Sequence, residues 1–150
     1  MKTMTKLGLA VILFMATAAG NYSQAQTKEE TITWIKENLE KHGGIDGIVS
    51  YSFINVSVSP CSVSFTEKND DNNKLMYKYS FNPSEVKEWT MEEEAFVGSY
   101  LSADKRIIKK NRISDDTNEY TWNLTIKKSD ILESMIKALK HLGTFCVEKK

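Results

Sequence analysis

Residues 47–67 read GIVSYSFINVSVSPCSVSFTE, and this stretch decides the expected fold. Its first half alternates apolar and other residues and places three side chains on one face of a strand: Val49, Tyr51 and Phe53. The apolar residues after Phe53 occupy the opposite phase, which predicts a bulge or bend. Pro60 lacks the amide that a central strand needs. We therefore expect residues 47–58 and 61–67 to form a tight antiparallel pair.

Further strand and turn patterns follow along the chain. A polar turn over residues 69–73 precedes an alternating strand over 75–81. Residues 84–94 are predicted to form a long connection with one helical turn, because their glutamates are typical of a solvated run. Three more strands are expected, at 96–101, 105–113 and 120–126, and the last two should pair as a hairpin.

A helix is predicted on each side of these strands. Thr27 and Glu30 have the spacing of a capping box, and the apolar stripe that follows indicates a helix over residues 28–42. Ser129 or Asp130 is expected to cap a second amphipathic helix that ends near Gly143. The fold class is therefore α+β: an N-terminal helix, a curved antiparallel sheet of five or six strands, and a C-terminal helix packed on the sheet.

The first 25 residues have the composition of an export signal. Lys2 and Lys6 precede a short apolar run, and small residues stand before a predicted cleavage between Ala25 and Gln26. Ala16-Thr17-Ala18 offers a competing site, and a retained N-terminal anchor stays open as the alternative, although the run is shorter than the ~20 residues of a membrane span. Residues 26–150 are then expected to form a single domain in the periplasm or outside the cell.

Charge excludes two classes of partner. The chain has 20 basic and 20 acidic residues, and loss of Lys2 and Lys6 leaves 18 against 20. Such a balance, with the signs interspersed, does not favour nucleic acid or a stable membrane anchor.

The two cysteines, Cys61 and Cys146, both follow the predicted signal. An even pair in an exported chain can form a disulfide if the compartment is oxidising and the Cα atoms come within about 7 Å. The alternative is two buried free thiols that behave as small hydrophobic side chains.

Catalytic and metal-binding patterns are weak. His42 and His141 each lie at the C-terminal end of a predicted helix, where a cation is favoured, and no zinc-ligand spacing occurs. Cys61 near either histidine would suit a nucleophile, but its apolar strand context favours a core thiol or half-cystine. The spacing of Asn69 and Asp71 begins like a calcium loop and then lacks the required glycine and glutamate. The sequence thus predicts no catalytic residue, no metal ligand and no cofactor.

One basic cluster carries an alternative function. Five positive side chains fall within eight residues: Lys105, Arg106, Lys109, Lys110 and Arg112. They form a candidate surface for an acidic partner, or else an edge strand that its lysines protect from pairing with other chains. We favour the edge strand.

Four short stretches resemble a known group of proteins: the signal ending in Ser-Gln-Ala-Gln, Trp34 to Leu39, Val56 to Cys61, and Ala138 to Leu142 with Cys146. They are similar to small uncharacterised secreted proteins of Bacteroidota. The resemblance implies a Gram-negative envelope location and transfers no activity or site residues.

The expected function is that of an exported, non-catalytic domain that binds a partner protein or a small apolar ligand in the cell envelope. A small secreted hydrolase, with residues that converge only in space, is the first alternative. A structural component of the envelope is the second.

Overall fold

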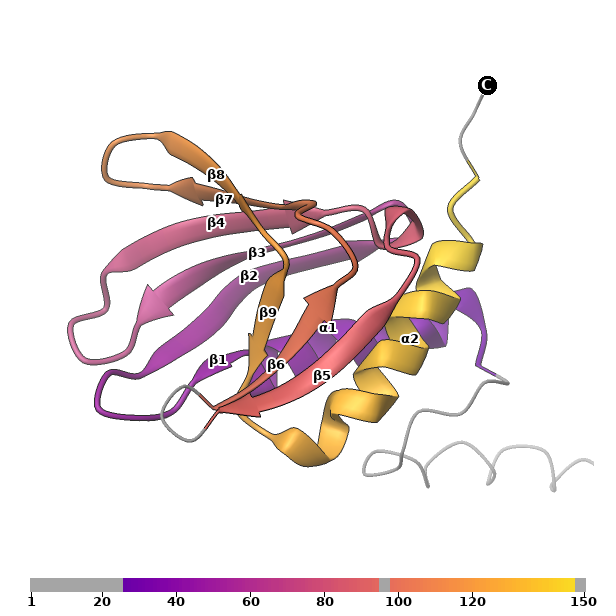
Figure 1. Cartoon of the computed structure of the whole chain (residues 1–150), viewed down its shortest axis with the longest axis horizontal. Helices are drawn as coiled ribbons and strands as arrows, with labels where there is room; N and C mark the ends of the chain where they lie inside the picture. The colour runs from indigo at the N-terminus through magenta and orange to yellow at the C-terminus, as the bar shows by residue number, and fades with distance from the viewer. Residues whose placement is uncertain (1–25, 95–97, 148–150) are drawn as a thin grey trace, which may run out of the picture.

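The computed structural model describes residues 26–94 and 98–147. The predicted export signal, residues 1–25, lies outside them, and so does the predicted start of a strand at Phe96. The described chain is an α+β fold with two helices and two antiparallel sheets (Figure 1).

Helix α1, Lys28–His42, matches the predicted range. Thr27 accepts a hydrogen bond from the Glu30 amide, and the Glu30 carboxylate accepts one from the Thr27 amide, so the predicted capping box is present. The helix ends at Gly43. Gly44 follows with φ of 115°, a left-handed conformation that favours glycine, and the chain enters the two-residue strand β1, Gly44–Ile45.

The predicted antiparallel pair is present as β2, Tyr51–Ser59, and β3, Ser62–Asn69. The pairing shifts between Ile54 and Ser57, which confirms the predicted irregularity. Strand β2 begins later than expected because Ile48 and Val49 lie exposed in the preceding turn. Strand β4, Leu75–Phe81, agrees with the prediction.

Six strands form the larger sheet, in the order β1-β2-β3-β4-β7-β8. Strand β7, Ile108–Arg112, pairs with both β4 and β8, Thr117–Thr121. The edge-strand interpretation of the basic cluster is therefore wrong, because β8 is the edge and β7 lies inside the sheet.

A second sheet of three strands, in the order β5-β6-β9, was not predicted. Strand β5, Trp89–Glu94, lies where a connection with one helical turn was expected; the short 3-10 helix η1, Pro83–Glu85, supplies that turn. As an edge strand, β5 keeps Glu92 and Glu93 exposed to solvent, and this concealed the strand pattern. It pairs with β6, Gly98–Ala103, which pairs with β9, Asn123–Ile126.

The predicted strand 120–126 is divided between the two sheets. Its first part belongs to β8 and pairs with β7, as the predicted hairpin requires, while its second part is β9. The chain bends at Trp122 and so carries the curl of the larger sheet over to the smaller one (Figure 1).

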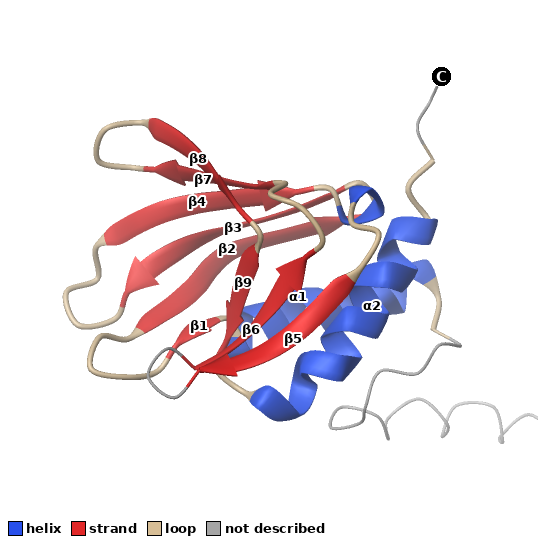
Figure 2. Ribbon diagram, in the orientation of Figure 1, coloured by secondary structure: helices blue, strands red, loops and turns tan. Residues whose placement is uncertain are grey.

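Helix α2, Leu132–Thr144, follows the 3-10 turn η2, Ser129–Ile131. Neither Ser129 nor Asp130 caps it, because Ile131 occupies the N-cap position without a side-chain hydrogen bond. Gly143 lies inside the last turn rather than after it. Helix α1 lies against β2 and α2, and α2 lies against η1, β5 and β6. Figure 2 shows both helices at one end of the molecule, so that the opposite end of the larger sheet stays open.

Candidate functional site

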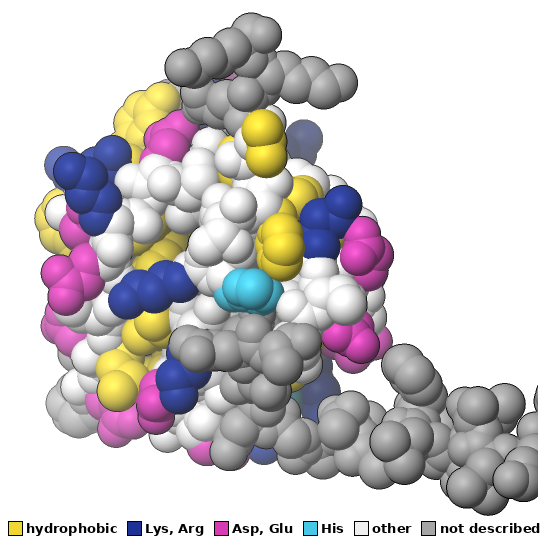
Figure 3. All heavy atoms as spheres, turned by 90° about the vertical axis from the view of Figure 1, so that its right-hand side faces the viewer, with side chains coloured by type: hydrophobic (Ala, Val, Ile, Leu, Met, Phe, Trp, Pro, Cys, Tyr) yellow, Lys and Arg dark blue, Asp and Glu magenta, His cyan; other side chains and the backbone are white. Residues whose placement is uncertain are grey.

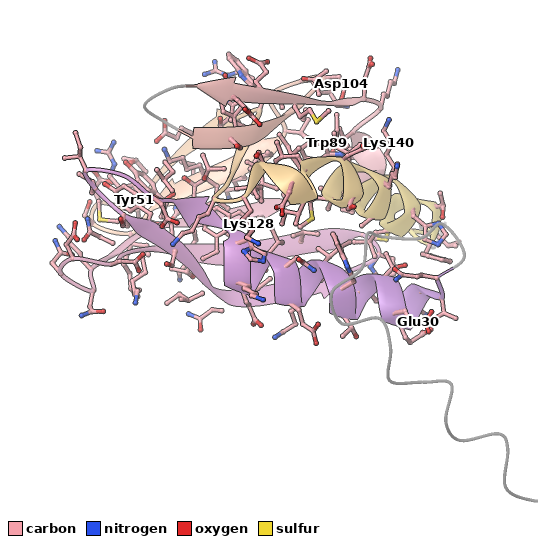
Figure 4. The ribbon with its side chains drawn as sticks, turned by 90° about the horizontal axis from the view of Figure 1, so that it is seen from below. Glu30, Tyr51, Trp89, Asp104, Lys128 and Lys140 are labelled. Atoms are coloured by element: carbon pink, nitrogen blue, oxygen red, sulfur yellow. A yellow bond between two sulfur atoms is a disulfide. The ribbon has the colours of Figure 1, made fainter. Side chains whose placement is uncertain are left out.

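A cavity of about 280 Å³ lies between the concave face of the larger sheet and strand β9. It occupies the end of the sheet away from the helices. Figure 4 shows one of its lining residues, Tyr51, far from Glu30 and Lys140, which lie toward the other end of α1 and α2. The lining side chains come from both sheets: Ile45, Tyr51, Phe53, Glu67, Tyr79, Lys110, Thr121, Asn123, Leu124 and Thr125.

Strand register brings the central lining residues together. Phe53 and Glu67 are cross-strand partners on β2 and β3. Tyr79 on β4 is the partner of Phe65 on one side and of Lys110 on the other. Because partners in an antiparallel pair share a face, these side chains gather on the concave side.

Two aromatic rings line one wall of the cavity, Phe53 and Tyr79, and each stacks against Phe65 behind them. The ring centroids of Phe53 and Phe65 are 4.0 Å apart, and those of Phe65 and Tyr79 are 5.0 Å apart. Phe53 and Phe65 are almost fully buried. The wall is thus apolar, and it continues from the hydrophobic core.

Glu67 is the buried carboxyl group of this wall, with only 8% of the residue exposed. Its Oε2 accepts a hydrogen bond of 3.2 Å from the Tyr79 hydroxyl. Burial raises the pKa of the Glu67 carboxyl, and the hydrogen bond from Tyr79 and the charge of Lys110 oppose this rise. Burial and the adjacent Glu67 in turn raise the pKa of Tyr79.

Lys110 lies on β7, which β4 separates from the strand of Glu67, and its ammonium is near two other residues. Its Nζ is 3.9 Å from the ring centroid of Tyr77 and 3.9 Å from Oε1 of Glu119. Among the residues that the structure describes, no cation lies within ion-pair distance of Glu67.

The opposite wall is polar. Asn123 Oδ1 accepts a hydrogen bond from the Ser102 hydroxyl at 2.8 Å, and Thr121 Oγ1 accepts one from the backbone amide of Asn123 at 3.2 Å. These two bonds leave the side-chain NH₂ of Asn123 and the hydroxyl hydrogen of Thr121 for other acceptors. The cavity combines an aromatic wall, one buried carboxyl group and a polar rim.

A second polar cluster, near the same end, has the residue types of a serine–lysine pair. The Ser52 hydroxyl donates to Asp70 at 2.6 Å and accepts from Lys127 Nζ at 3.1 Å. Lys127 also lies 3.0 Å from Asp46 and 3.6 Å from Asp70. An ammonium between two carboxylates has no lone pair with which to take the serine proton, so we interpret the cluster as a structural clamp between β9 and the larger sheet.

The cysteines do form a bond. Cys61 and Cys146 are joined, with their Cα atoms 4.8 Å apart, which confirms the disulfide rather than two free thiols. Cys61 lies exposed in the turn between β2 and β3, not within the strand that was predicted for it. It therefore cannot serve as a nucleophile beside His42 or His141.

The histidines lie away from the cavity. His42 is at the end of α1, where burial and the charges of Lys128 and Lys41 lower its pKa. His141 Nε2 is 3.0 Å from the carbonyl oxygen of Gln26. A surface depression along α2 includes Glu133 and His141, but Glu133 binds Lys137 at 2.6 Å and stands two helical turns from the histidine.

The basic cluster does not form one surface. Lys110 and Arg112 point to the concave side with their partners Tyr79 and Tyr77, whereas Lys109 points to the convex side. Arg106 covers the ring of Trp122 at 4.8 Å, and Lys105 is exposed in the turn before β7. On the face beside α2, Figure 3 shows acidic and basic side chains interspersed.

The turn with calcium-loop spacing, residues 69–73, does not provide a metal site among the described residues. The predicted turn after β3 is a loop in which Asn69 Oδ1 accepts hydrogen bonds from the amides of Asp71 and Asn72. Across the described part of the chain, no group of three or more potential ligands is placed to hold a metal ion.

Sequence reasoning missed Glu67 and Tyr79. The one available signal was a carboxylate in phase with the apolar row Val63 and Phe65 of a predicted strand. Alternation assigns Glu67 to the buried face, where a carboxylate is unexpected. Because Glu67 is the last residue of the predicted strand 61–67, close to the polar turn that follows, it did not stand out as a buried carboxylate.

Comparison of the chain with protein-family models, with curated proteins and with solved structures finds no match. Within the described residues, no helix has both the length and the apolar character needed to span a bilayer.

Proposed function

We propose that this protein is a binding domain whose ligand, a small molecule with an apolar part, occupies the cavity beneath the curled sheet. The cavity itself carries the proposal. Its volume of about 280 Å³ is just below the range of ligand sites, which starts at roughly 300 Å³, so a small ligand is expected. Its walls have the usual composition of such sites, with apolar and aromatic side chains and a few convergent polar groups.

The size and shape of the site favour a small molecule over a partner protein. A protein interface of standard size buries about 800 Å² on each partner and is built on a broad patch. The cavity is instead a recess bounded by two sheets, with Glu67 and Phe53 buried at its wall. A ligand that enters it removes apolar surface from water without a large flat contact.

We propose that the domain works in the cell envelope or outside the cell. The disulfide between Cys61 and Cys146 supports this location, since such bonds persist in oxidising compartments. The leader-like composition of residues 1–25 and the resemblance to secreted Bacteroidota proteins point the same way.

The binding proposal is tested by NMR titration of the ¹⁵N-labelled protein with small aromatic fragments such as indole and phenol. We expect shifts concentrated at the lining residues of the cavity. Thr125→Phe places a ring in the cavity and should weaken binding at least tenfold, because the space is then filled. Thr90→Phe is the matched control, since Thr90 is exposed on β5 and does not line the cavity.

Shifts spread over other surfaces, or fragment binding that Thr125→Phe leaves unchanged, would contradict the proposal. Retained amide dispersion in both variants shows that each is folded. A difference in fragment binding between Thr125→Phe and Thr90→Phe then reflects the filled cavity and not a loss of folding.

A further inference from the structure

We propose that the ligand of this cavity carries a protonated amine, which pairs with Glu67, on an apolar or aromatic body that lies against Phe53 and Tyr79. This inference rests on the proposed binding function and names the ligand class of that same site.

The carboxyl group of Glu67 lacks partners for its full hydrogen-bonding capacity. Oε2 accepts from the Tyr79 hydroxyl at 3.2 Å, and no other hydrogen bond of the Glu67 side chain occurs among the described residues. A carboxylate offers about four acceptor positions on its two oxygens. Because the residue is 92% buried and lines the cavity, a donor that reaches its remaining positions must come from inside the cavity.

The charge of Glu67 also lacks a direct counter-ion. Lys110, the cation that lines the cavity, is held at 3.9 Å from Glu119 and over the ring of Tyr77, and it forms no ion pair with Glu67. A buried carboxylate is stable only when it is paired or protonated. A ligand ammonium supplies both the missing charge and three N–H donors.

Aromatic residues suit the rest of such a ligand. The cavity is lined by Tyr51, Phe53 and Tyr79, whose ring faces carry negative potential and attract an adjacent cation. The rings of Phe53 and Tyr79, each stacked against Phe65 behind them, also give an apolar platform for the body of the ligand.

Other ligand classes fit less well. A ligand carboxylate placed at Glu67 would meet a like charge, or would require Glu67 to stay protonated. A neutral alcohol would supply one donor and no charge. Lys110 is the feature that favours an anion, so the experiment must compare all three head groups.

Three matched probes make this comparison by calorimetry and NMR: 2-phenylethylammonium, 2-phenylethanol and 3-phenylpropanoate. We expect the ammonium to bind at least tenfold more tightly than the alcohol and the carboxylate. Glu67→Gln keeps the side-chain size and removes the charge, so it should abolish this preference. Glu93→Gln, at an exposed position on β5 away from the cavity, should retain it.

A second variant guards against loss of folding in Glu67→Gln. Lys110→Met removes the positive charge that repels a ligand ammonium. It should therefore tighten binding of 2-phenylethylammonium severalfold and weaken binding of 3-phenylpropanoate. If the alcohol or the carboxylate binds as tightly as the ammonium, the ligand class is wrong but cavity binding stands. If none of the three probes or the neutral fragments shifts the lining residues, both proposals are overturned.

Discussion

At the scale of single residues, the molecule places one carboxyl group at a buried position where it forms a single side-chain hydrogen bond, with Tyr79. Glu67 stands in an apolar row between Phe53 and Tyr77, at a position where a hydrophobic side chain would complete the aromatic wall. Burying a charge without an ion pair costs free energy. A residue of this kind is explained more readily by what it binds than by packing, which is why the proposed site is centred on it.

The buried carboxyl group should make stability depend on pH in a direction opposite to most acidic residues. Burial raises the pKa of Glu67 in the folded state above its ordinary value of 4.5. Glu67 therefore binds its proton more tightly when folded, and its contribution to stability is lost as the pH rises above 4.5. As the pH rises, the unliganded protein should lose on the order of 1 kcal/mol of stability relative to Glu67→Gln, because Glu67 becomes charged at a buried position where Tyr79 is its one hydrogen-bond partner among the described residues.

Urea unfolding of both proteins from pH 4 to pH 8 measures this difference. The comparison with Glu67→Gln cancels the effect of other groups, such as Asp70, whose pKa is lowered by the Ser52 hydrogen bond and by Lys127. Glu93→Gln, at an exposed position on β5, is the control for the loss of a surface carboxylate. A constant difference for Glu67→Gln would show that Glu67 is not desolvated in solution.

At the scale of elements, the strands show what alternation can and cannot predict. The alternating residues of β2, β3 and β4 assign each side chain to a face, and the register agrees. Alternation does not tell which sheet a strand joins, so residues 120–126 were predicted as one strand although Trp122 bends the chain between two sheets. The basic residues led to a wrong prediction of an edge strand. Lys109 and Lys110 lie on opposite faces of β7, a strand inside the larger sheet.

The irregularity in β2 depends on one backbone position. Asn55 has φ of 53°, a left-handed conformation, and its side chain is exposed. Asparagine tolerates this conformation better than other residues except glycine. We expect Asn55→Ala to destabilise the protein by about 1 kcal/mol and Asn55→Gly to have little effect.

Urea unfolding at constant pH distinguishes the two variants. Since the exposed side chain makes little packing contribution, the Gly variant isolates the backbone term. Equal losses in Ala and Gly would attribute the effect to the asparagine side chain and not to its backbone conformation. Both results bear on the cavity, because the bulge sets the curl of β2 beside Phe53.

At the scale of the whole molecule, the sequence predicted the α+β class, the helix over residues 28–42 and a C-terminal helix. These features depend on local periodicity and on a capping box. The second sheet and the cavity depend on non-local pairing, such as β9 with β6 and Gly43 with Ile126, which leaves no local pattern. Glu67, Tyr79 and Lys110 lie on three strands, so only the register brings them together.

The disulfide joins the two ends of this architecture and provides a global test. It links the turn after β2 to the chain after α2 across 85 residues of sequence. Closing a loop of that length stabilises a protein by about 4.5 kcal/mol in the chain-entropy model. The double variant Cys61→Ser, Cys146→Ser should therefore show a Tm lower by roughly 15 to 20 °C.

Calorimetry of the variant, with reduced wild-type protein as the control, checks this expectation. The two should melt together, because both lack the same constraint on the unfolded chain. Neither cysteine lines the cavity, so the variant should still bind 2-phenylethylammonium below its Tm. A variant that melts with the oxidised protein would show that the bond does not constrain unfolding. A folded double variant that has lost binding would show instead that the disulfide shapes the cavity, because the bond fixes how α2 and the larger sheet meet.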